Sequence, residues 1–182
     1  RGRAGRTGPG VCYRLWTAES HHALADRNTP EILQGDLAAL VLELAIWGID
    51  DPSRLKWLDP PPAAACRQAG ALLRELDALD AVGRVTDHGR RMAGLPLHPR
   101  LAHMMLMAER HHRGDAACDL AAVLSERDFV KFPAGAYDSD LGLRLEILAG
   151  QREGRPIEAD RFTVDRPACR RCLRVAEALR LK

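Results

Sequence analysis

The stretch ALLRELDALDAVGRVTDHGRRMAGLPLHPRL, residues 71–101, carries the pattern that decides the fold. It completes a predicted helix over 63–79, in which apolar residues recur at intervals of three and four. Residues 80–83 predict a tight turn and 84–86 a short strand. Thr86 or Asp87 can then cap a further short helix that ends at Gly94. A helix, a small wing and a second helix in this order predict a winged-helix domain.

The flanking sequence extends this prediction in both directions. Upstream, the apolar pattern of 30–47 predicts a helix that stops at Gly48, and the proline-containing stretch 50–62 predicts a connector. Downstream, further helices are predicted, at about 100–112, 115–126, 139–151 and 166–182. The fold class is therefore mainly α: a winged-helix domain over 35–97, followed by an α-helical bundle over 98–182.

The first 34 residues differ from the rest. The alternation in Val11–Trp16 predicts a short strand, but no hairpin partner lies nearby, so its sheet is expected upstream. Residues 17–30 predict a linker. The chain also begins without Met, in the middle of a motif, and we therefore expect a fragment.

Composition sets wide limits on function. The chain has 182 residues, 46% of them hydrophobic, and a formal net charge of +2, so bulk charge does not indicate a polyanionic partner. Basic residues instead gather at the two ends of the chain. The five cysteines follow no disulfide framework, which favours a reducing compartment, and we expect the cytoplasm. No apolar run approaches the ~20 residues of a membrane span, so no membrane partner is expected.

Several cysteines and histidines raise the question of a metal site. Cys169 and Cys172 form a single C-x-x-C, without the second ligand pair that zinc requires or the βαβ setting of a redox site. The pairs His21-His22 and His111-His112 consist of adjacent residues, whose side chains diverge by about 100° on a helix. We therefore predict no metal site.

The segment RGRAGRTGPG, residues 1–10, carries the chemistry. Arg3 and Arg6 are three residues apart, and small residues around them allow close approach to one anionic target. Phosphate is the natural target, because arginines that stabilise a transferring phosphoryl group contribute on the order of 10³ to 10⁵ in rate. Composition alone also allows an arginine- and glycine-rich tail that binds RNA weakly or only aids solubility.

GRAGR at 2–6 followed by GVCYRL at 10–15 resembles motif VI of the DEAH-box helicases with its trailing strand. The family pattern begins Gln-Arg-X, of which only the X is present, as Arg1. The resemblance implies that Arg3 and Arg6 face the γ-phosphate as arginine fingers, and that Gly2 and Gly5 provide backbone at the ATP site. Residues 1–34 would then be the orphan C-terminal piece of a RecA-like α/β domain, the second of two.

The resemblance continues along the chain. TPEIL at 29–33, DLAALVLEL at 36–44 and TDHG at 86–89 are similar to the family's winged-helix region, and LPLHPRL at 95–101 to the passage into its helicase-associated, ratchet-like domain. WLDPPP at 57–62 and YDSDL at 137–141 most resemble the bacterial HrpB type. The resemblance implies ATP and Mg²⁺ in the intact enzyme, upstream RecA-like domains in the same chain, and movement along single-stranded nucleic acid, with RNA implied by the family alone.

The sequence lacks the rest of an ATP site. Its lysines, Lys56, Lys131 and Lys182, follow Leu55, Val130 and Leu181, so there is no Walker A lysine, and no Asp-Glu pair is present. The intact protein is expected to be an ATP-dependent helicase, whereas this chain alone should hold neither ATP nor Mg²⁺ and should be inactive.

Two helices are candidates for nucleic-acid contact. Acidic residues of the helix over 63–79 lie beside Arg67 and Arg74, which suits phosphate poorly. Arg166, Arg170 and Arg174 recur at a spacing of four and predict one positive ridge, although a solvated face with Glu177 is equally compatible. Two other classes of function stay open: a winged-helix DNA-binding regulator with an arginine-rich arm, and a partner-binding helical module.

Overall fold

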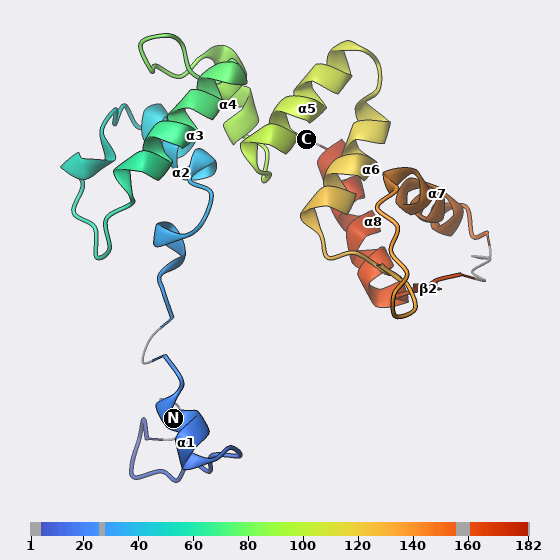
Figure 1. The fold of residues 1–182 in the computed structure, drawn as a ribbon. Coiled ribbons are helices and arrows are strands. Elements are labelled where there is room, and N and C mark those ends of the chain that lie inside the picture. Colours follow the sequence, from blue (N-terminus) through green and yellow to red (C-terminus); the bar gives the residue numbers. More distant parts are fainter. Residues whose placement is uncertain (1–4, 26–27, 156–160, 182) are drawn as a thin grey trace.

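The computed structural model describes residues 5–25, 28–155 and 161–181, and all statements below concern these residues. The chain is mainly helical, as predicted, and Figure 1 shows α2–α4 and α6–α8 as two groups joined through α5. The helices are α1 (Ala18–His22), α2 (Ala38–Ile46), α3 (Ala63–Glu75), α4 (Asp87–Ala93), α5 (Pro99–Arg110), α6 (Gly114–Ser125), α7 (Leu141–Arg152) and α8 (Arg166–Arg180). Short 3₁₀ turns lie at Glu31–Leu33 and Pro52–Arg54, and the strands are β1 (Val130–Lys131) and β2 (Thr163–Val164).

The first group, α2 to α4, forms the winged-helix part. Its core contains buried apolar side chains from these helices and from the turn after α3: Leu42, Leu73, Ala78, Leu79 and Met92. The turn after α3 is held by Asp80, whose Oδ1 accepts hydrogen bonds from the backbone N–H groups of Val82 and Arg84. Residues 30–36 precede α2 as a 3₁₀ turn and loop rather than as its first helical turns.

The predicted strand over 84–86 is reduced to a single bridge between Leu79 and Val85. The reason lies in Thr86, whose Oγ1 accepts from the N–H of Gly89 as the cap of α4 and donates to the carbonyl of Asp77. Because the chain enters a helix directly after Val85, no length remains for a longer ribbon. Gly89 lies so close to the turn that a Cβ there would sit 2.2 Å from the carbonyl oxygen of Ala78.

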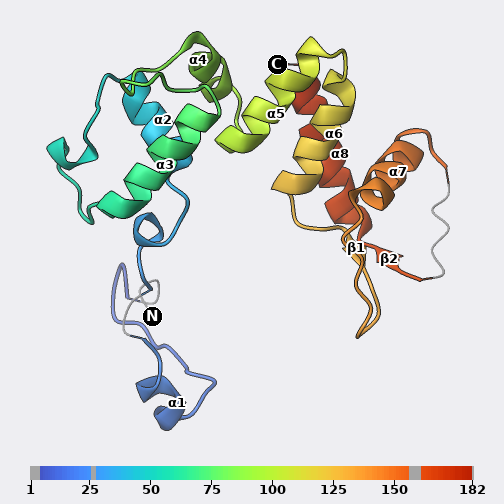
Figure 2. The same ribbon diagram turned by 45° about the horizontal axis from the view of Figure 1, so that its top comes forward.

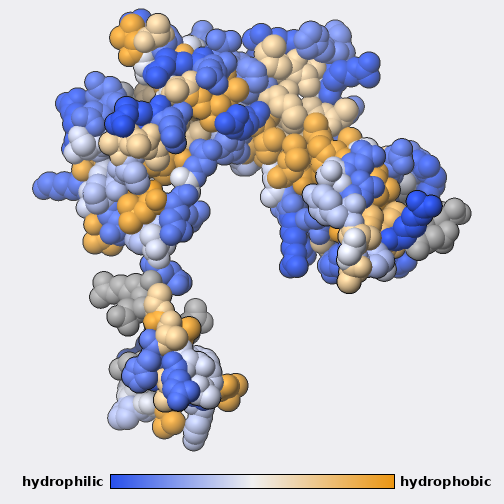
Figure 3. Space-filling model, viewed as in Figure 1, coloured by the Kyte–Doolittle hydropathy of each residue, from blue (hydrophilic) through white to orange (hydrophobic). Residues whose placement is uncertain are grey.

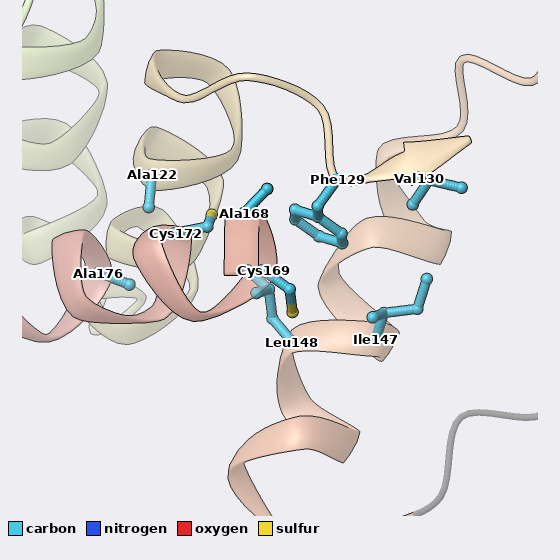
Figure 4. Packing of buried hydrophobic residues seen from close by; sticks show 9 residues of the cluster. All are labelled: Ala122, Phe129, Val130, Ile147, Leu148, Ala168, Cys169, Cys172 and Ala176. Atoms are coloured by element: carbon cyan, nitrogen blue, oxygen red, sulfur yellow. The ribbon is translucent and has the colours of Figure 1, made fainter. Parts of the chain in front are cut away.

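The second group, α6 to α8, packs around one apolar cluster. Figure 4 shows Phe129 and Val130, at the end of the loop after α6, facing Ile147 of α7 and Cys169 of α8. Strands β1 and β2 pair antiparallel, with Val130 opposite Val164. This ribbon was not predicted, because two-residue strands carry no periodic signal and the partners lie far apart in the sequence.

Helix α5 connects the two groups. Ala102 and Leu106 belong to the winged-helix core, whereas Met104 and Met105 pack against Cys118 and the other buried side chains of α6 and α8. Figures 1 and 2 show α5 between α4 and α6 in both views. Because α5 contributes side chains to both cores, the structure does not divide the chain at one residue. The domain boundaries at 34/35 and 97/98 therefore stay predictions.

The segment 5–25 lies apart from both groups (Figures 1 and 2). All its residues are exposed except the half-buried His21, and Figure 3 shows apolar side chains on its surface. Val11–Trp16 forms no strand in this structure, because no neighbouring strand is present among the described residues to exchange backbone hydrogen bonds with it; the sheet predicted for it was expected upstream. A short helix, α1, lies in the stretch predicted as a linker.

The described ranges contain neither a membrane-spanning helix nor a metal-binding cluster. None of their helices combines the length and apolar character of a membrane span. No cluster of three or more histidine, cysteine, aspartate or glutamate side chains is arranged to hold a metal ion among those residues.

Candidate nucleotide and nucleic-acid sites

The structure describes only two of the four predicted ATP-site residues, Gly5 and Arg6. Gly2 and Arg3 lie outside the described residues. Arg6 is exposed and forms no ion pair with any residue of 5–25, 28–155 or 161–181. Gly5 is also exposed, and a Cβ there would meet nothing nearer than the carbonyl oxygen of Gly8 at 4.0 Å. Among the described residues, Arg6 is therefore an exposed guanidinium group without an ion-pair partner.

Helix α8 places the C-terminal arginines with a fixed spacing. The carboxylate of Asp165 caps its first turn by accepting from the N–H of Ala168 at 3.1 Å, and Pro167 fits the start of the helix. One face of α8 is buried against α6 and the loop before β1. The opposite face carries four exposed arginines, which we call the α8 arginine face: Arg166, Arg170, Arg171 and Arg174.

Ion pairs distinguish this face from the other arginines of the helical group. Arg180 donates to Asp119 at 2.7 Å and to Asp115 at 3.1 Å, and Arg152 donates to the same Asp119 at 2.7 Å. Burial acts to lower the pKa of Arg180, but the hydrogen bond to Asp119 raises it overall. Within the described part of the chain, the α8 arginine face forms no ion pair. Its positive charge is therefore available to a ligand.

The carboxylate at the start of α8, Asp165, is already engaged. Lys131 donates to Asp165 at 2.9 Å, and this hydrogen bond is the main cause that lowers the pKa of the Asp165 carboxyl. Glu177 is exposed and lies one turn beyond Arg174. The predicted ridge of Arg166, Arg170 and Arg174 is thus exposed. Arg171 also lies on this face, although the spacing of four did not predict it.

The C-x-x-C of α8 faces the interior. Cys169 and Cys172 are buried, and burial raises the pKa of the Cys172 thiol to about 12 and also raises that of Cys169. Metal binding and thiol exchange both require the thiolate. The environment of this pair opposes the thiolate and suits two small apolar side chains in a core.

Helix α3 presents a mixed surface. Arg67 and Arg74 are exposed together with Glu75, and Asp77 follows directly in a left-handed conformation with φ 54°. A hollow of about 540 Å³ beside the helix is lined by both of these arginines and by Asp50 and Asp51. This balance of charge is less favourable to a phosphate backbone than the α8 arginine face.

Sequence reasoning missed the buried ion pair of Arg144. This α7 side chain is 5% exposed, donates to the carboxylate of Asp128 at 2.7 Å and to the carbonyl of Asp140 at 2.9 Å, and lies over the ring of Phe132 at 5.8 Å. Burial acts to raise the pKa of Asp128, but the hydrogen bond from Arg144 lowers it overall. No local pattern signals the ion pair, since Asp128 lies 16 residues upstream, in the loop after α6.

The sequence and fold of this chain are similar to those of known helicases. A model of the winged-helix part of the helicase associated domain HA2 matches residues 71–97. The ATP-dependent RNA helicase HrpB of Escherichia coli K12 is 39% identical over 142 residues, which cover 78% of this chain and 17% of that protein. This chain is similar to a part of the HrpB-type DEAH-box helicases. The family predicted from motif VI and the winged-helix segments is thereby confirmed.

Other matches agree. The probable ATP-dependent RNA helicase DHX34 of mouse is 37% identical over 125 residues, covering 69% of this chain and 11% of that protein. Two crystal structures of Escherichia coli HrpB match with TM-scores of 0.60 and 0.61 and identities of 33% and 34%. They cover 100% and 97% of this chain and 20% of each solved chain. The chain thus spans a fifth or less of the length of these relatives.

Proposed function

We propose that this chain is the helicase-associated part of an ATP-dependent RNA helicase, in which it guides single-stranded RNA while ATP is hydrolysed elsewhere in a longer protein. The observation that carries the proposal is the match to HrpB over the full chain, with 33% identity and a TM-score of 0.60. The relatives named above are described as ATP-dependent RNA helicases. The five free cysteines keep the cytoplasm as the expected compartment.

In this proposal the α8 arginine face contacts the phosphate backbone. Arg166, Arg170 and Arg174 lie on successive turns of one helix and have no competing acid partner among the described residues. Guanidinium groups at fixed spacing bind phosphates without reading bases, which suits a protein that must move along any sequence. Few aromatic side chains accompany them, so the contact follows the backbone rather than stacking on bases.

The nucleotide side of the proposal rests on the arginines of motif VI. Arg3 and Arg6 would stabilise the charge on a γ-phosphate that upstream RecA-like domains of the same protein hold together with Mg²⁺. Gly2 and Gly5 would let the backbone approach this site. The 182-residue chain contains no Walker A lysine, so ATP must be held by other residues.

An RNA-binding assay tests the role of α8. The double variant Arg170→Glu/Arg174→Glu of this 182-residue chain is compared with Arg67→Glu/Arg74→Glu on α3, a control with the same change of charge. Fluorescence anisotropy with a single-stranded RNA should give at least about a tenfold loss of affinity for the α8 variant, with a smaller salt dependence. Equal losses for both variants would contradict the assignment.

A second assay tests motif VI. In the longer helicase that contains this chain, Arg6→Ala should lower the rate of ATP hydrolysis by about 10³ or more while nucleotide still binds. Arg14→Ala, outside the Arg3/Arg6 pair, serves as control. Unchanged turnover in Arg6→Ala would refute the role of this arginine. Sequence-specific binding of duplex DNA by the chain would instead favour the regulator, for which neither the comparisons nor the charge of α3 gives support.

A further inference from the structure

Two histidines meet at the joint between the winged-helix part and α5. Nε2 of His88, in α4, lies 2.9 Å from Nδ1 of His103, in α5. The rings are edge to face, with centroids 5.1 Å apart. This histidine pair is a direct polar contact between α4, which belongs to the winged-helix core, and α5, which continues into the helical group.

The positions of the hydrogens follow from counting. Two neutral imidazoles carry two N–H hydrogens, and the 2.9 Å contact requires one of them between the rings. The other lies either on Nδ1 of His88 or on Nε2 of His103. Nδ1 of His88 is buried and has no hydrogen-bond partner among the described residues, and a buried N–H without an acceptor is unfavourable. The neutral pair therefore has His88 donating from Nε2 and His103 protonated on Nε2.

While this contact persists, only one nitrogen of the pair is free to accept a further proton. That nitrogen is Nδ1 of His88, which is buried and has no acceptor nearby among the described residues. Two added protons would leave N–H facing N–H and break the contact. The packed pair is thus compatible with the neutral state and is strained or broken by protonation.

The surroundings of His88 also favour its neutral form, because together they lower its pKa. Burial is the main cause that lowers the pKa of His88, followed by His103 and Arg110 on α5 and by Arg91 on α4 itself. Asp77, after α3, opposes them. Glu43, the charged residue of α2, is exposed and does not contribute to this shift.

We propose that the histidine pair is a proton-sensitive joint, closed while both rings are neutral and loosened when the pair takes up a proton, so that acid frees the winged-helix part to move relative to α6–α8. The other polar link between α4 and α5 in the described part of the chain, Arg91 to Glu109 at 2.7 Å, is exposed at both side chains. Such a pair contributes little by itself, so the histidine pair is the polar contact that makes the joint sensitive to protons, beside the apolar packing of Met92 on Ala102 and Leu106.

The direction of the pH effect is fixed by the lowered pKa. The open joint exposes His88, which then titrates near its ordinary value of about 6.5, whereas the closed joint binds fewer protons. The contribution to closure is therefore complete well above pH 6.5 and falls as the pH drops below it. For one histidine kept neutral, the ratio of closed to open joint should fall about tenfold between pH 7.5 and pH 5.5.

Amide hydrogen exchange on the 182-residue chain tests the joint. After correction for intrinsic rates, protection of α4 and of the first half of α5 should fall about tenfold more than protection of α6 and α8 between pH 7.5 and pH 5.5. His88→Phe keeps a ring but cannot titrate, and should abolish this difference. His111→Gln, at an exposed histidine just after α5, should retain it.

The tautomers give an independent test that needs no variant. Long-range ¹H–¹⁵N correlation spectra of the unaltered chain at pH 7.5 should show both rings protonated on Nε2 only. A His88 protonated on Nδ1, or a His88 whose pKa is not lowered, would overturn the proposal. So would equal pH dependence of protection in α4–α5 and in α6–α8.

Discussion

Arginines gather at both ends of this chain; those of α8 are held in place by a packed helix, whereas the described N-terminal segment 5–25 is packed on neither helical group. Along α8, Cys169, Cys172 and Ala176 are buried against α6, and the arginines on the other face therefore keep their spacing. In the segment 5–25 the large apolar side chains, Val11 and Tyr13 among them, are exposed, and nothing in the described structure fixes the position of Arg6. The described residues thus fix the α8 arginines through the core beneath them, whereas they give Arg6 no packing partner.

The largest expected effect comes from the closest backbone contact in the packed part. Gly89→Ala places a methyl group 2.2 Å from the carbonyl oxygen of Ala78, so the turn after α3 must move away from α4. We expect a loss of at least about 3 kcal/mol in the free energy of unfolding, or no folding, measured by urea denaturation. The matched control is Gly114→Ala, where a Cβ meets nothing within 4 Å; a similar loss there would disprove the steric explanation.

The next effect concerns the buried arginine that sequence reasoning missed. Arg144→Met keeps an apolar side chain but leaves Asp128 without its partner at 2.7 Å and removes the guanidinium group over Phe132, and should cost about 2 kcal/mol. The pKa of Asp128 is lowered in the folded chain, so its contribution is complete above about pH 4 and is lost as the pH falls through the lowered value.

Unfolding measured between pH 2 and pH 6 should therefore show a shallower acid dependence in Arg144→Met. Arg54→Met, which removes an ion pair exposed at both side chains, is the control and should change stability by less than about 0.5 kcal/mol. An unchanged acid profile in Arg144→Met would show that this ion pair does not couple to folding.

A pair of threonine caps compares the two regions directly. Thr86 caps α4 by accepting from Gly89, and Thr17 caps α1 by accepting from Ser20. Thr86→Val should cost about 1 to 2 kcal/mol, because the helix lies in the cooperative core and the hydroxyl also donates to the carbonyl of Asp77. Thr17→Val should leave the global unfolding transition unchanged. Equal costs would mean that the N-terminal segment folds together with the core.

The smallest effect is expected from removing that segment altogether. The side-chain hydrogen bonds formed by residues 5–25 stay within the segment, and it shares none of the buried clusters of the described residues. Deletion of residues 1–25 should change the free energy of unfolding by less than about 0.5 kcal/mol. Calorimetry of the two chains checks this, and a loss of several kcal/mol would reveal stabilising contacts between this segment and the packed helices.

The predictions were accurate where an element depends on residues close together in the sequence, and less accurate where it depends on residues far apart. The helices after residue 60 were placed within a few residues because their signals are local: apolar periodicity, caps such as Thr86, and Pro99 in a first turn. The wing was overestimated, since the cap of α4 uses the residues expected to extend it. The β1–β2 ribbon was missed because its register is set by packing on α7 and α8.

The same division applies to the candidate sites. The ridge of Arg166, Arg170 and Arg174 could be predicted from helical spacing alone, but its lack of ion pairs within the described residues could not. In the same helical group, Asp119 pairs with both Arg152 and Arg180, and Asp115 pairs with Arg180. The histidine pair is a further case, because His88 and His103 meet only through the packing of α4 on α5.

By itself, the sequence determined the family, the mainly helical fold class, and the residue types available for phosphate contact, because these depend on local periodicity and on short motifs. Tertiary structure alone decided which charges are satisfied, which histidines touch, and that Arg144 is buried. The physical reason is that desolvation and ion pairing depend on neighbours brought together by packing, and their energies are set by distance in space rather than by separation along the chain.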